Sequence, residues 1–343
     1  MKVGVVGGGL AGALLAWRLS EASDRVRVEV VVGRRTRPDA SAVSGGLVRG
    51  FELDPGAGRV AAESLAELRG DDRLREWSGY REIGSLYVVP RGVDPAGSVR
   101  VVDERLPGSP AVVDAGELRR RFGFRDLADD AVGVVERHAG YLSPAKLRDS
   151  ALARAADQGV DVVAADAVDV RDGPALRTSD GVERRYDALV VAAGAWTPGL
   201  VDHGGTLRTK QIQYGVYRVP LSGLGAFVDD DTGLYGRPWG DGTFLLGLGC
   251  DRWDVRPEAV EPDLALADRV AAGVRRRFGV AVGAAPPEKV VASFDCYRSP
   301  AGLRLLPVDG RPGLFTFTGG SGGAAKTAVV VSRRAAGELL TTL

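Results

Sequence analysis

The sequence contains few of the features that mark secreted, nucleic-acid-binding or membrane-spanning proteins. Its two cysteines, Cys250 and Cys296, are too few and too far apart to predict a disulfide framework. The 45 lysines and arginines equal the 45 acidic residues, so no overall field favours nucleic acid or an anionic membrane as a partner. No apolar run reaches the length of a membrane span, and the chain enters its first strand-like segment directly, which leaves no room for a signal peptide. These absences favour a cytoplasmic location.

Two common kinds of catalytic site are also missing. The sequence shows no Ser/His/Asp set and no clustered cysteine and histidine spacing of the kind that holds a metal. Its hydrophobic content of 45% and charged content of 26% are ordinary for a soluble globular protein, and 343 residues are enough for two domains. Arginine greatly outnumbers lysine, and alanine, glycine and valine are abundant, as is typical of a GC-rich bacterial genome.

A glycine-rich turn lies at the start of the chain. The strand-like residues 3–6 are followed by a turn that contains Gly7, Gly9 and Gly12. A helical apolar pattern begins within this turn and continues beyond it. In this strand–turn–helix context the spacing predicts a dinucleotide-binding fingerprint. Gly7 permits the tight turn, Gly9 lets the backbone approach a pyrophosphate, and Gly12 allows close helix–strand packing. The free amides of the helix N-terminus then face the diphosphate. A glycine-rich turn without a ligand is the alternative.

The second predicted strand, residues 26–32, is β-branched and nearly uninterrupted, as expected of a buried parallel strand. In a Rossmann unit an acidic residue for a ribose hydroxyl stands at the carboxyl end of this strand. Here that position is Gly33, and Arg34 and Arg35 follow. The two arginines could meet a 2′-phosphate, as in NADP binding, or an adenine face. Arginines of a solvated loop are the alternative.

Two compositional types alternate along the rest of the chain. Helical patterns cover residues 58–77 and 145–158, and buried strands are predicted at 160–164 and 188–193. Insertions rich in alternating strands begin near residues 80 and 210. Units of the first type bind nucleotides, whereas insertions of the second type usually shape a substrate pocket. The flat part of a cofactor should therefore lie where the two types meet.

The whole chain resembles the D-amino-acid-oxidase-like flavoenzymes, the group that includes glycine oxidase and monomeric sarcosine oxidase. The resemblance rests on motifs at residues 7–12, 41–46, 140–144, 190–196 and 318–326, whose order and spacing cover nearly the whole sequence. It implies FAD as cofactor and oxidation of a C–N bond by hydride transfer to flavin N5, which gives an imine.

The fold class implied by this resemblance is α/β with an α+β part inserted. A Rossmann-like FAD-binding domain is expected at residues 1–78, 138–208 and 293–343. A discontinuous, mainly antiparallel β-sheet substrate domain is expected at residues 79–137 and 209–292.

The glycine loop at residues 319–323 precedes the last predicted helix, 324–340, so its amides point at whatever lies before that helix. In the family this is the flavin's pyrimidine edge, whose negative charge on reduction such donors stabilise. A glycine-rich connector is the alternative. Together with the first glycine turn, these patterns predict a cofactor site built from Leu10, Ala11, Arg34, Arg35, Ser41, Ser44, Gly45, Gly46, Val168, Ala193, Gly194, Trp196, Cys296, Gly319, Gly320, Ser321, Gly322, Gly323, Ala324 and Lys326.

The resemblance also implies residues that meet the substrate. Arg298 falls where glycine oxidase-like members place an arginine for the substrate carboxylate, and a guanidinium suits bidentate recognition of that group. A salt bridge between domains is the alternative. Lys326 falls where sarcosine oxidase-like members have a carboxylate-binding lysine, with an ordinary surface lysine as the alternative. Arg49 and Tyr214 are further pocket candidates, although Tyr214 could be a core aromatic.

Cys296 falls where sarcosine oxidase-like members carry the cysteine that bonds covalently to the flavin. A free buried cysteine is the commoner outcome, so a noncovalent cofactor is favoured.

Two departures from the family leave the chemistry open. Leu245 stands where the sarcosine oxidase branch has the lysine that promotes reaction with oxygen, and the active-site histidines of that branch have no counterpart, since His138 and His203 lie outside the matching motifs. The predicted partners are a small amine or amino acid and either oxygen or another electron acceptor. The alternatives are a biosynthetic tailoring dehydrogenase or NADPH-using monooxygenase of the same fold, and a non-catalytic nucleotide-binding protein.

Overall fold

A computed structural model describes residues 1–34, 39–202, 204–221, 223–280 and 287–342. The sequence predictions that concern Arg35 and His203 fall outside these ranges. No helix in the described part of the chain is long and apolar enough to cross a membrane.

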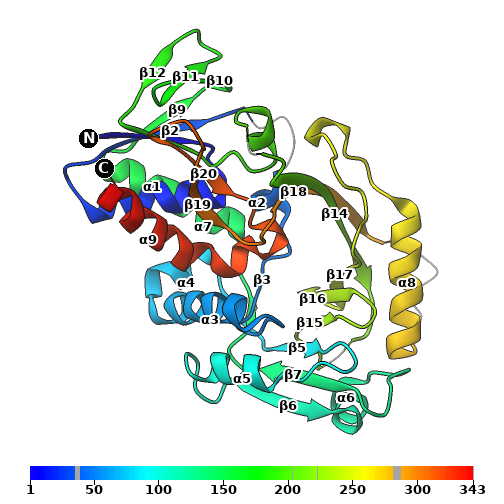
Figure 1. Ribbon diagram of the computed structural model, residues 1–343. Helices are drawn as coiled ribbons and strands as arrows, with labels where there is room; N and C mark the ends of the chain where they lie inside the picture. The colour runs from blue at the N-terminus through cyan, green and yellow to red at the C-terminus, as the bar shows by residue number, and fades with distance from the viewer. Residues whose placement is uncertain (35–38, 203, 222, 281–286, 343) are drawn as a thin grey trace.

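A six-stranded sheet forms the half of the molecule that carries both ends of the described chain (Figure 1). All neighbouring strands are parallel except β19 and β20, which pair in the antiparallel sense. The strands, in spatial order, are β19 (Arg304–Pro307), β20 (Leu314–Thr318), β13 (Ala188–Val191), β1 (Lys2–Val6), β2 (Arg27–Val32) and β9 (Asp161–Ala164). The central strands are buried almost completely, which explains their near-continuous apolar sequences.

Helices cover one face of this sheet, and a small antiparallel sheet covers the other (Figure 1). Helix α1 contacts both α7 and α9, and its fully buried Trp17 belongs to their common core. The helices are α1 (Leu10–Ala22), α3 (Pro55–Gly70), α4 (Asp72–Ser78), α7 (Pro144–Asp157) and α9 (Ala324–Thr342). The small sheet consists of β10 (Ala167–Arg171), β11 (Ala175–Thr178) and β12 (Glu183–Arg185).

The single helix predicted at residues 58–77 is in fact two helices, α3 and α4. Asp71 separates them, because its carboxylate accepts hydrogen bonds from the amides of Arg73 and Leu74 and so caps a new helix.

The second half of the molecule is an eight-stranded, mainly antiparallel sheet in which only β15 and β5 are parallel neighbours. Its strands, in spatial order, are β18 (Lys289–Arg298), β14 (Leu207–Arg218), β17 (Thr243–Gly247), β16 (Leu234–Gly240), β15 (Ala226–Asp229), β5 (Ser85–Val88), β7 (Val132–Glu136) and β6 (Pro110–Asp114). Helices α8 (Leu264–Phe278) and α6 (Ala115–Phe122) pack on it, and α5 (Ala96–Asp103) lies beside β6. The mixed α/β class with a mainly antiparallel second sheet is therefore confirmed.

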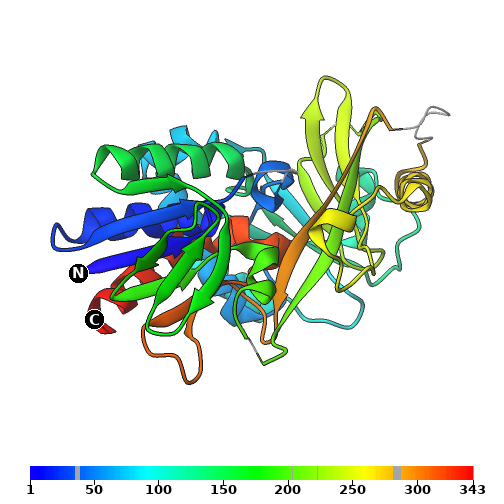
Figure 2. The same cartoon turned by 90° about the horizontal axis from the view of Figure 1, so that it is seen from above.

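The edge strand β18 of the second sheet contacts β20 of the first sheet and the loop that follows β20. In Figure 2 the long strands β14 and β18 run from the junction into the second half. A three-stranded sheet, β3 (Leu47–Val48), β8 (Gly140–Tyr141) and β4 (Arg81–Glu82), also joins segments that are distant in sequence. The remaining short elements are the helix α2 (Ala40–Val43) and the 3-10 turns η1 (Gly194–Gly199), η2 (Pro257–Ala259) and η3 (Ser321–Gly323).

Candidate cofactor and substrate site

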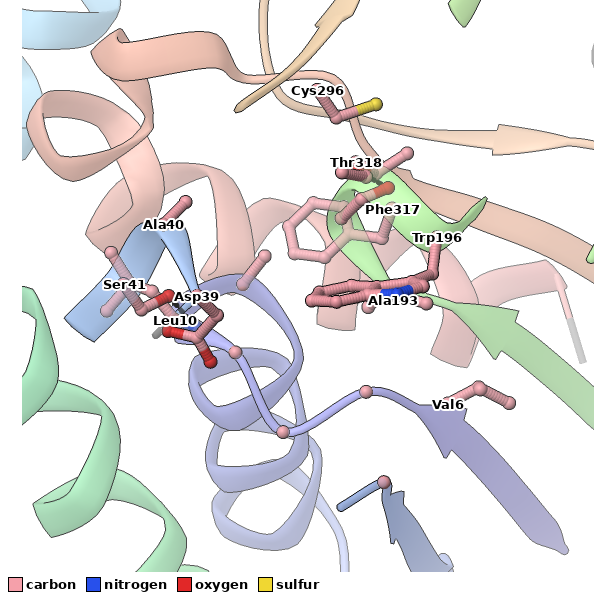
Figure 3. A pocket seen from close by; sticks show the side chains of 18 of the residues that line it. Val6, Leu10, Asp39, Ala40, Ser41, Ala193, Trp196, Cys296, Phe317 and Thr318 are labelled. Carbon is pink, nitrogen blue, oxygen red and sulfur yellow. Dashed lines mark hydrogen bonds between the residues drawn. The ribbon is translucent and has the colours of Figure 1, made fainter. Parts of the chain in front are cut away.

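A cavity of about 770 Å³ lies at the carboxyl ends of β1, β2 and β13; we call it the larger cavity. Its walls come from the loops that follow these strands and from the loop between β20 and α9. Figure 3 shows Leu10 and Ser41 on one side of it and Trp196, Thr318 and Cys296 on the other. The glycine loops at opposite ends of the sequence thus line one cavity, in the position where open α/β sheets bind ligands.

The three glycines of the first turn have different structural requirements. Gly7 has a φ of +113°, and an added Cβ there would lie 2.5 Å from the carbonyl oxygen of Ala192. A Cβ on Gly12 would lie 2.1 Å from the carbonyl oxygen of Gly7. Gly9 has an ordinary φ of −74°, and a Cβ there would meet Ser41 Oγ at 3.5 Å, a normal contact. Only the space in the cavity therefore requires a glycine at position 9.

The N-terminus of α1 faces the same cavity. Gly9 occupies the N-cap and offers no side chain, so the first turn of α1 lacks the usual side-chain cap. The hydroxyl of Ser41 accepts one bond there, from the amide of Leu10 at 3.0 Å. Such a helix start favours an anionic ligand group.

The C-terminal glycine loop turns sharply before α9. Gly319 has a φ of +87°, and an added Cβ would lie 2.5 Å from Arg298 Cβ. Ser321 also has a positive φ, of +54°, which is uncommon for a non-glycine residue and typical of functional turns. Gly320 pairs with Tyr297 in an isolated bridge, which fixes the loop against β18.

A second cavity, of about 310 Å³, adjoins the first; we call it the smaller cavity. The two cavities share lining residues from four segments: Leu10, Ala40, Ser41, Asp295, Ser321 and Ala324. All three side chains predicted to meet the substrate from this region, Arg49, Tyr214 and Lys326, line the smaller cavity. A ligand in the larger cavity can therefore reach a compartment with its own polar groups.

Two cations in the smaller cavity share one carboxylate. Arg49 lies 3.2 Å from Glu52, and the Lys326 ammonium donates a hydrogen bond to the same carboxylate. Burial opposes ionisation of Glu52, but Arg49 and Lys326 hold its pKa below the ordinary value. Burial, with Arg49 acting in the same direction, lowers the pKa of Lys326. Two cations against one carboxylate leave a positive charge that matches an anionic substrate group.

The loop that carries Arg49 is anchored by a fully buried glutamate. Glu136 accepts hydrogen bonds from the amides of Gly50 and Phe51, both at 2.9 Å. Burial raises the pKa of Glu136, while the two amide bonds and the charge of Arg49 act in the opposite direction. The guanidinium of Arg49 in turn donates to the carbonyl of Phe51 at 3.0 Å. The arginine is therefore held in place by its own loop.

An aspartate from the connection between β9 and β10 compensates for the missing acidic residue at Gly33. A Cβ on Gly33 would lie 3.0 Å from Asp166 Oδ1, so the carboxylate of Asp166 occupies the vacant place. Asp166 accepts from the Arg34 amide at 2.7 Å and from its guanidinium at 2.9 Å, and both residues line the larger cavity. Because Arg34 is paired with a carboxylate, its charge is less available to a 2′-phosphate.

The structure places most predicted residues at one of the two cavities. The predicted residues that line only the larger cavity are Gly7, Gly9, Ala11, Arg34, Val168, Ala193, Gly194, Trp196, Cys296, Gly319 and Gly320. The predicted residues that line only the smaller cavity are Ser44, Gly45, Gly46, Arg49, Tyr214, Gly322, Gly323 and Lys326. Leu10, Ser41, Ser321 and Ala324 line both cavities. Gly12 lies behind the larger cavity, against Gly7.

Arg298 lines neither cavity. Its guanidinium donates to Thr316 at 2.9 Å and to Thr206 at 3.4 Å, and its Cβ packs against Gly319. Arg298 therefore supports the glycine loop from outside. Leu245 is fully buried beneath the loop residue Gly45, and His138 interacts with Glu82 at 3.0 Å, away from both cavities.

Sequence reasoning missed Asp295, which lines both cavities, as well as Asp166 and Tyr235. The signal for Asp295 is present in the sequence, because a charged residue interrupts the otherwise uncharged strand segment 290–296. Within the described ranges, no group of three or more His, Cys, Asp or Glu residues could hold a metal ion.

Comparisons with known proteins agree with this geometry. Residues 2–337 match the family described as FAD dependent oxidoreductase. Monomeric sarcosine oxidase from Streptomyces avermitilis is 28% identical over 196 residues, which are 55% of this chain and 46% of that protein. The match thus spans less than half the length of this relative.

Two solved structures share the fold over nearly their whole length. Glycine oxidase from Bacillus cereus ATCC 14579 superposes with a TM-score of 0.76 and 16% identity, covering 100% of this chain and 95% of the other. L-proline dehydrogenase from P. horikoshii gives a TM-score of 0.80 with 14% identity, covering 99% and 93% of the two chains. Because the family match extends over almost the entire sequence, this chain belongs to the FAD-dependent oxidoreductases.

Proposed function

We propose that the chain holds FAD across the two cavities and oxidises the C–N bond of a small amine or amino acid to an imine. The observation that carries this proposal is the meeting of the two glycine loops at one cavity, which adjoins a compartment that contains Arg49 and Lys326. Gly9 fits the cofactor in particular, because neither its φ nor a neighbouring atom of the chain requires a glycine there. When bound, FAD supplies a hydride acceptor at its isoalloxazine ring.

The chain's own residues have separate roles in this proposal. Amides at the start of α1 and in the loop 319–323 bind the anionic parts of the cofactor. Arg49 and Lys326 bind the substrate carboxylate and fix the amine in the smaller cavity. Burial raises the pKa of the Cys296 thiol, which disfavours the reactive thiolate, so we propose a noncovalent cofactor. Reoxidation is by oxygen or another acceptor.

We also propose the domain division expected from the sequence. Residues 1–78, 138–208 and 293–343 would form the FAD-binding domain, and residues 79–137 and 209–292 the substrate-binding domain. Most strands of the two large sheets fall on the corresponding sides of these boundaries. The long strands β14 and β18 cross the boundaries at 208 and 293, consistent with a continuous junction at the site.

Flavin reduction tests the proposed function. The FAD-loaded protein is mixed without oxygen with sarcosine, glycine or L-proline, the compounds in the names of the relatives above, and its visible absorbance is followed. We expect at least one of them to bleach the flavin and NADPH to leave it oxidised. Rapid bleaching by NADPH alone would instead favour the tailoring monooxygenase. A colourless protein that takes up no FAD would favour a non-catalytic role.

The adenosine end of the cofactor gives a separate prediction. Asp166→Ala should weaken FAD binding about 10- to 100-fold, because a hydrogen bond to a charged group contributes about 1.5–3 kcal/mol. In our proposal Asp166 replaces the missing acidic residue at position 33 as acceptor for a ribose hydroxyl. The measurement is titration of the apoprotein with FAD by fluorescence.

The control for this prediction is Asp169→Ala, which removes a nearby half-exposed carboxylate that lines neither cavity. Equal affinities of the Asp166 and Asp169 variants would remove Asp166 from this role.

A further inference from the structure

A buried carboxyl group without a hydrogen-bond partner lies where the two cavities join. Asp295, on β18, lines both cavities and is only 4% exposed. Its Oδ2 atom is buried and has no hydrogen-bond partner among the residues that the structure describes. A Cβ added to Gly322 would lie 3.3 Å from this oxygen, so the carboxyl group faces the C-terminal glycine loop.

The groups that face Asp295 do not neutralise it. Lys210 is its direct partner in the β14–β18 ladder, but the Lys210 ammonium lies 4.5 Å from the ring centre of Trp253 and 5.7 Å from that of Tyr297. The hydroxyl of Tyr235, on β16, donates to the Gln213 carbonyl at 3.1 Å. Burial and the charge of Asp295 raise the pKa of Tyr297 to about 12, so this phenol stays neutral.

The remaining charged groups nearby are already engaged. Arg49 and Lys326, in the same smaller cavity, are paired with Glu52. The neighbouring Cys296 thiol is kept neutral by a pKa that burial raises. Burial, with nothing to offset it, raises the pKa of Asp295 to about 7. A carboxyl group in this environment exchanges its proton near neutral pH.

Such a group is costly to the fold. A buried polar atom without a partner destabilises the folded state, and native proteins retain few of them. A structural aspartate would cap a helix or pair with a cation, as Asp71 and Asp229 do in this chain. Asp295 does neither in the described structure. Its lone carboxyl group lines the same cavity as Arg49 and Lys326, which suit a carboxylate, and it therefore fits the other charged end of an amino acid.

We propose that Asp295 is the base that takes a proton from the substrate's ammonium nitrogen before hydride transfer. The inference rests on the proposed function. The N–H bond of the ammonium group breaks and its proton forms the O–H bond of Asp295, while the electron pair stays on nitrogen. That pair forms the C=N bond of the imine as the hydride, with its two electrons, leaves carbon for FAD. A base whose proton exchange is matched to the working pH is efficient in this role.

The pH dependence of flavin reduction by sarcosine tests this role. The rate with the FAD-loaded wild type at limiting sarcosine should rise about tenfold per pH unit up to about pH 7 and then level off. In Asp295→Asn the break near neutrality should vanish, the rate at pH 7 should fall about 100-fold or more, and the rate should keep rising toward the pKa of the free amine. The matched control, Asp251→Asn, removes an exposed carboxylate that lines neither cavity and should keep the wild-type break.

Binding of methoxyacetate gives a readout without turnover. This compound has the shape and carboxylate of sarcosine, but an ether oxygen replaces the nitrogen. A protonated Asp295 can donate a hydrogen bond to the ether, whereas the ionised form repels it. Affinity, measured from the flavin absorbance change, should therefore weaken about tenfold per pH unit above about pH 7 in the wild type and stay constant in Asp295→Asn. This titration of the wild type decides the matter even if the variant does not fold.

The outcomes separate the two proposals. If sarcosine reduces the flavin and the break near pH 7 persists in Asp295→Asn, or if methoxyacetate affinity in the wild type is flat with pH, the role of Asp295 is overturned alone. If the protein takes up no FAD, or no amine reduces it, the proposed function fails and the role of Asp295 fails with it.

Discussion

Replacing Gly9 by alanine should leave the apoprotein folded and weaken FAD binding by at least about 100-fold. The backbone at Gly9 is ordinary, with a φ of −74°, and the nearest atom to an added Cβ is Ser41 Oγ at 3.5 Å. The methyl group therefore costs the empty chain little, but it occupies the space that a diphosphate needs above the start of α1. Thermal unfolding of the apoprotein and a fluorescence titration with FAD measure the two effects.

Gly12→Ala is the matched control, because it adds the same methyl group to the same turn at a position that lines neither cavity. Its Cβ would lie 2.1 Å from the Gly7 carbonyl oxygen, so the strand, turn and helix must move apart. We expect the apoprotein itself to lose about 1–3 kcal/mol of unfolding free energy, or more. If Gly9→Ala destabilised the apoprotein as much as Gly12→Ala does, a structural role would explain Gly9 and the cofactor argument would fail.

Arg49→Leu should lower kcat/KM for a carboxylated amine such as sarcosine by about 100-fold or more. Removing one partner of a buried hydrogen-bonded charge pair costs about 2–5 kcal/mol. In this chain the loss would leave Lys326 paired with Glu52 alone, so the Arg49–Glu52–Lys326 cluster would no longer carry a spare positive charge. FAD content should not change, because Arg49 lies outside the larger cavity. The measurement is anaerobic flavin reduction over a range of sarcosine concentrations.

The same assay with Arg298→Leu compares the two candidate anchors. Arg298 bonds to Thr206 and Thr316 and lines neither cavity, so we expect an effect on the stability of the 319–323 loop and less than about a threefold change in sarcosine affinity. A loss of sarcosine binding in Arg298→Leu with normal binding in Arg49→Leu would return the carboxylate to Arg298, as the family resemblance implies.

Local patterns in the sequence were sufficient for the elements around the first glycine turn. The spacing of Gly7, Gly9 and Gly12 acts within a few residues, and strand, turn and helix follow from it directly. The helix expected at 58–77 was wrong in one respect, because the capping carboxylate of Asp71 ends one helix and begins another. A short capping interaction outweighed a continuous apolar periodicity there.

Contacts between distant segments could not be read from the sequence. Strand β5 pairs in parallel with β15, about 140 residues later, and nothing in either strand specifies the partner. Asp166 fills the place beside Gly33 from a loop that lies more than 130 residues away in the sequence. Arg298 and Cys296 are near neighbours on β18, yet only Cys296 lines a cavity, because Gly319 packs against the arginine. The charge of Asp295 was visible, but its lack of a partner is a property of the fold.

A crystal structure of the FAD-loaded protein tests the central claim most directly. We expect the diphosphate at the turn formed by residues 7–12 and the isoalloxazine ring at the junction of the two cavities, in contact with residues 319–324. Density for FAD at another place, or a ring without contact to the C-terminal glycine loop, would contradict the account.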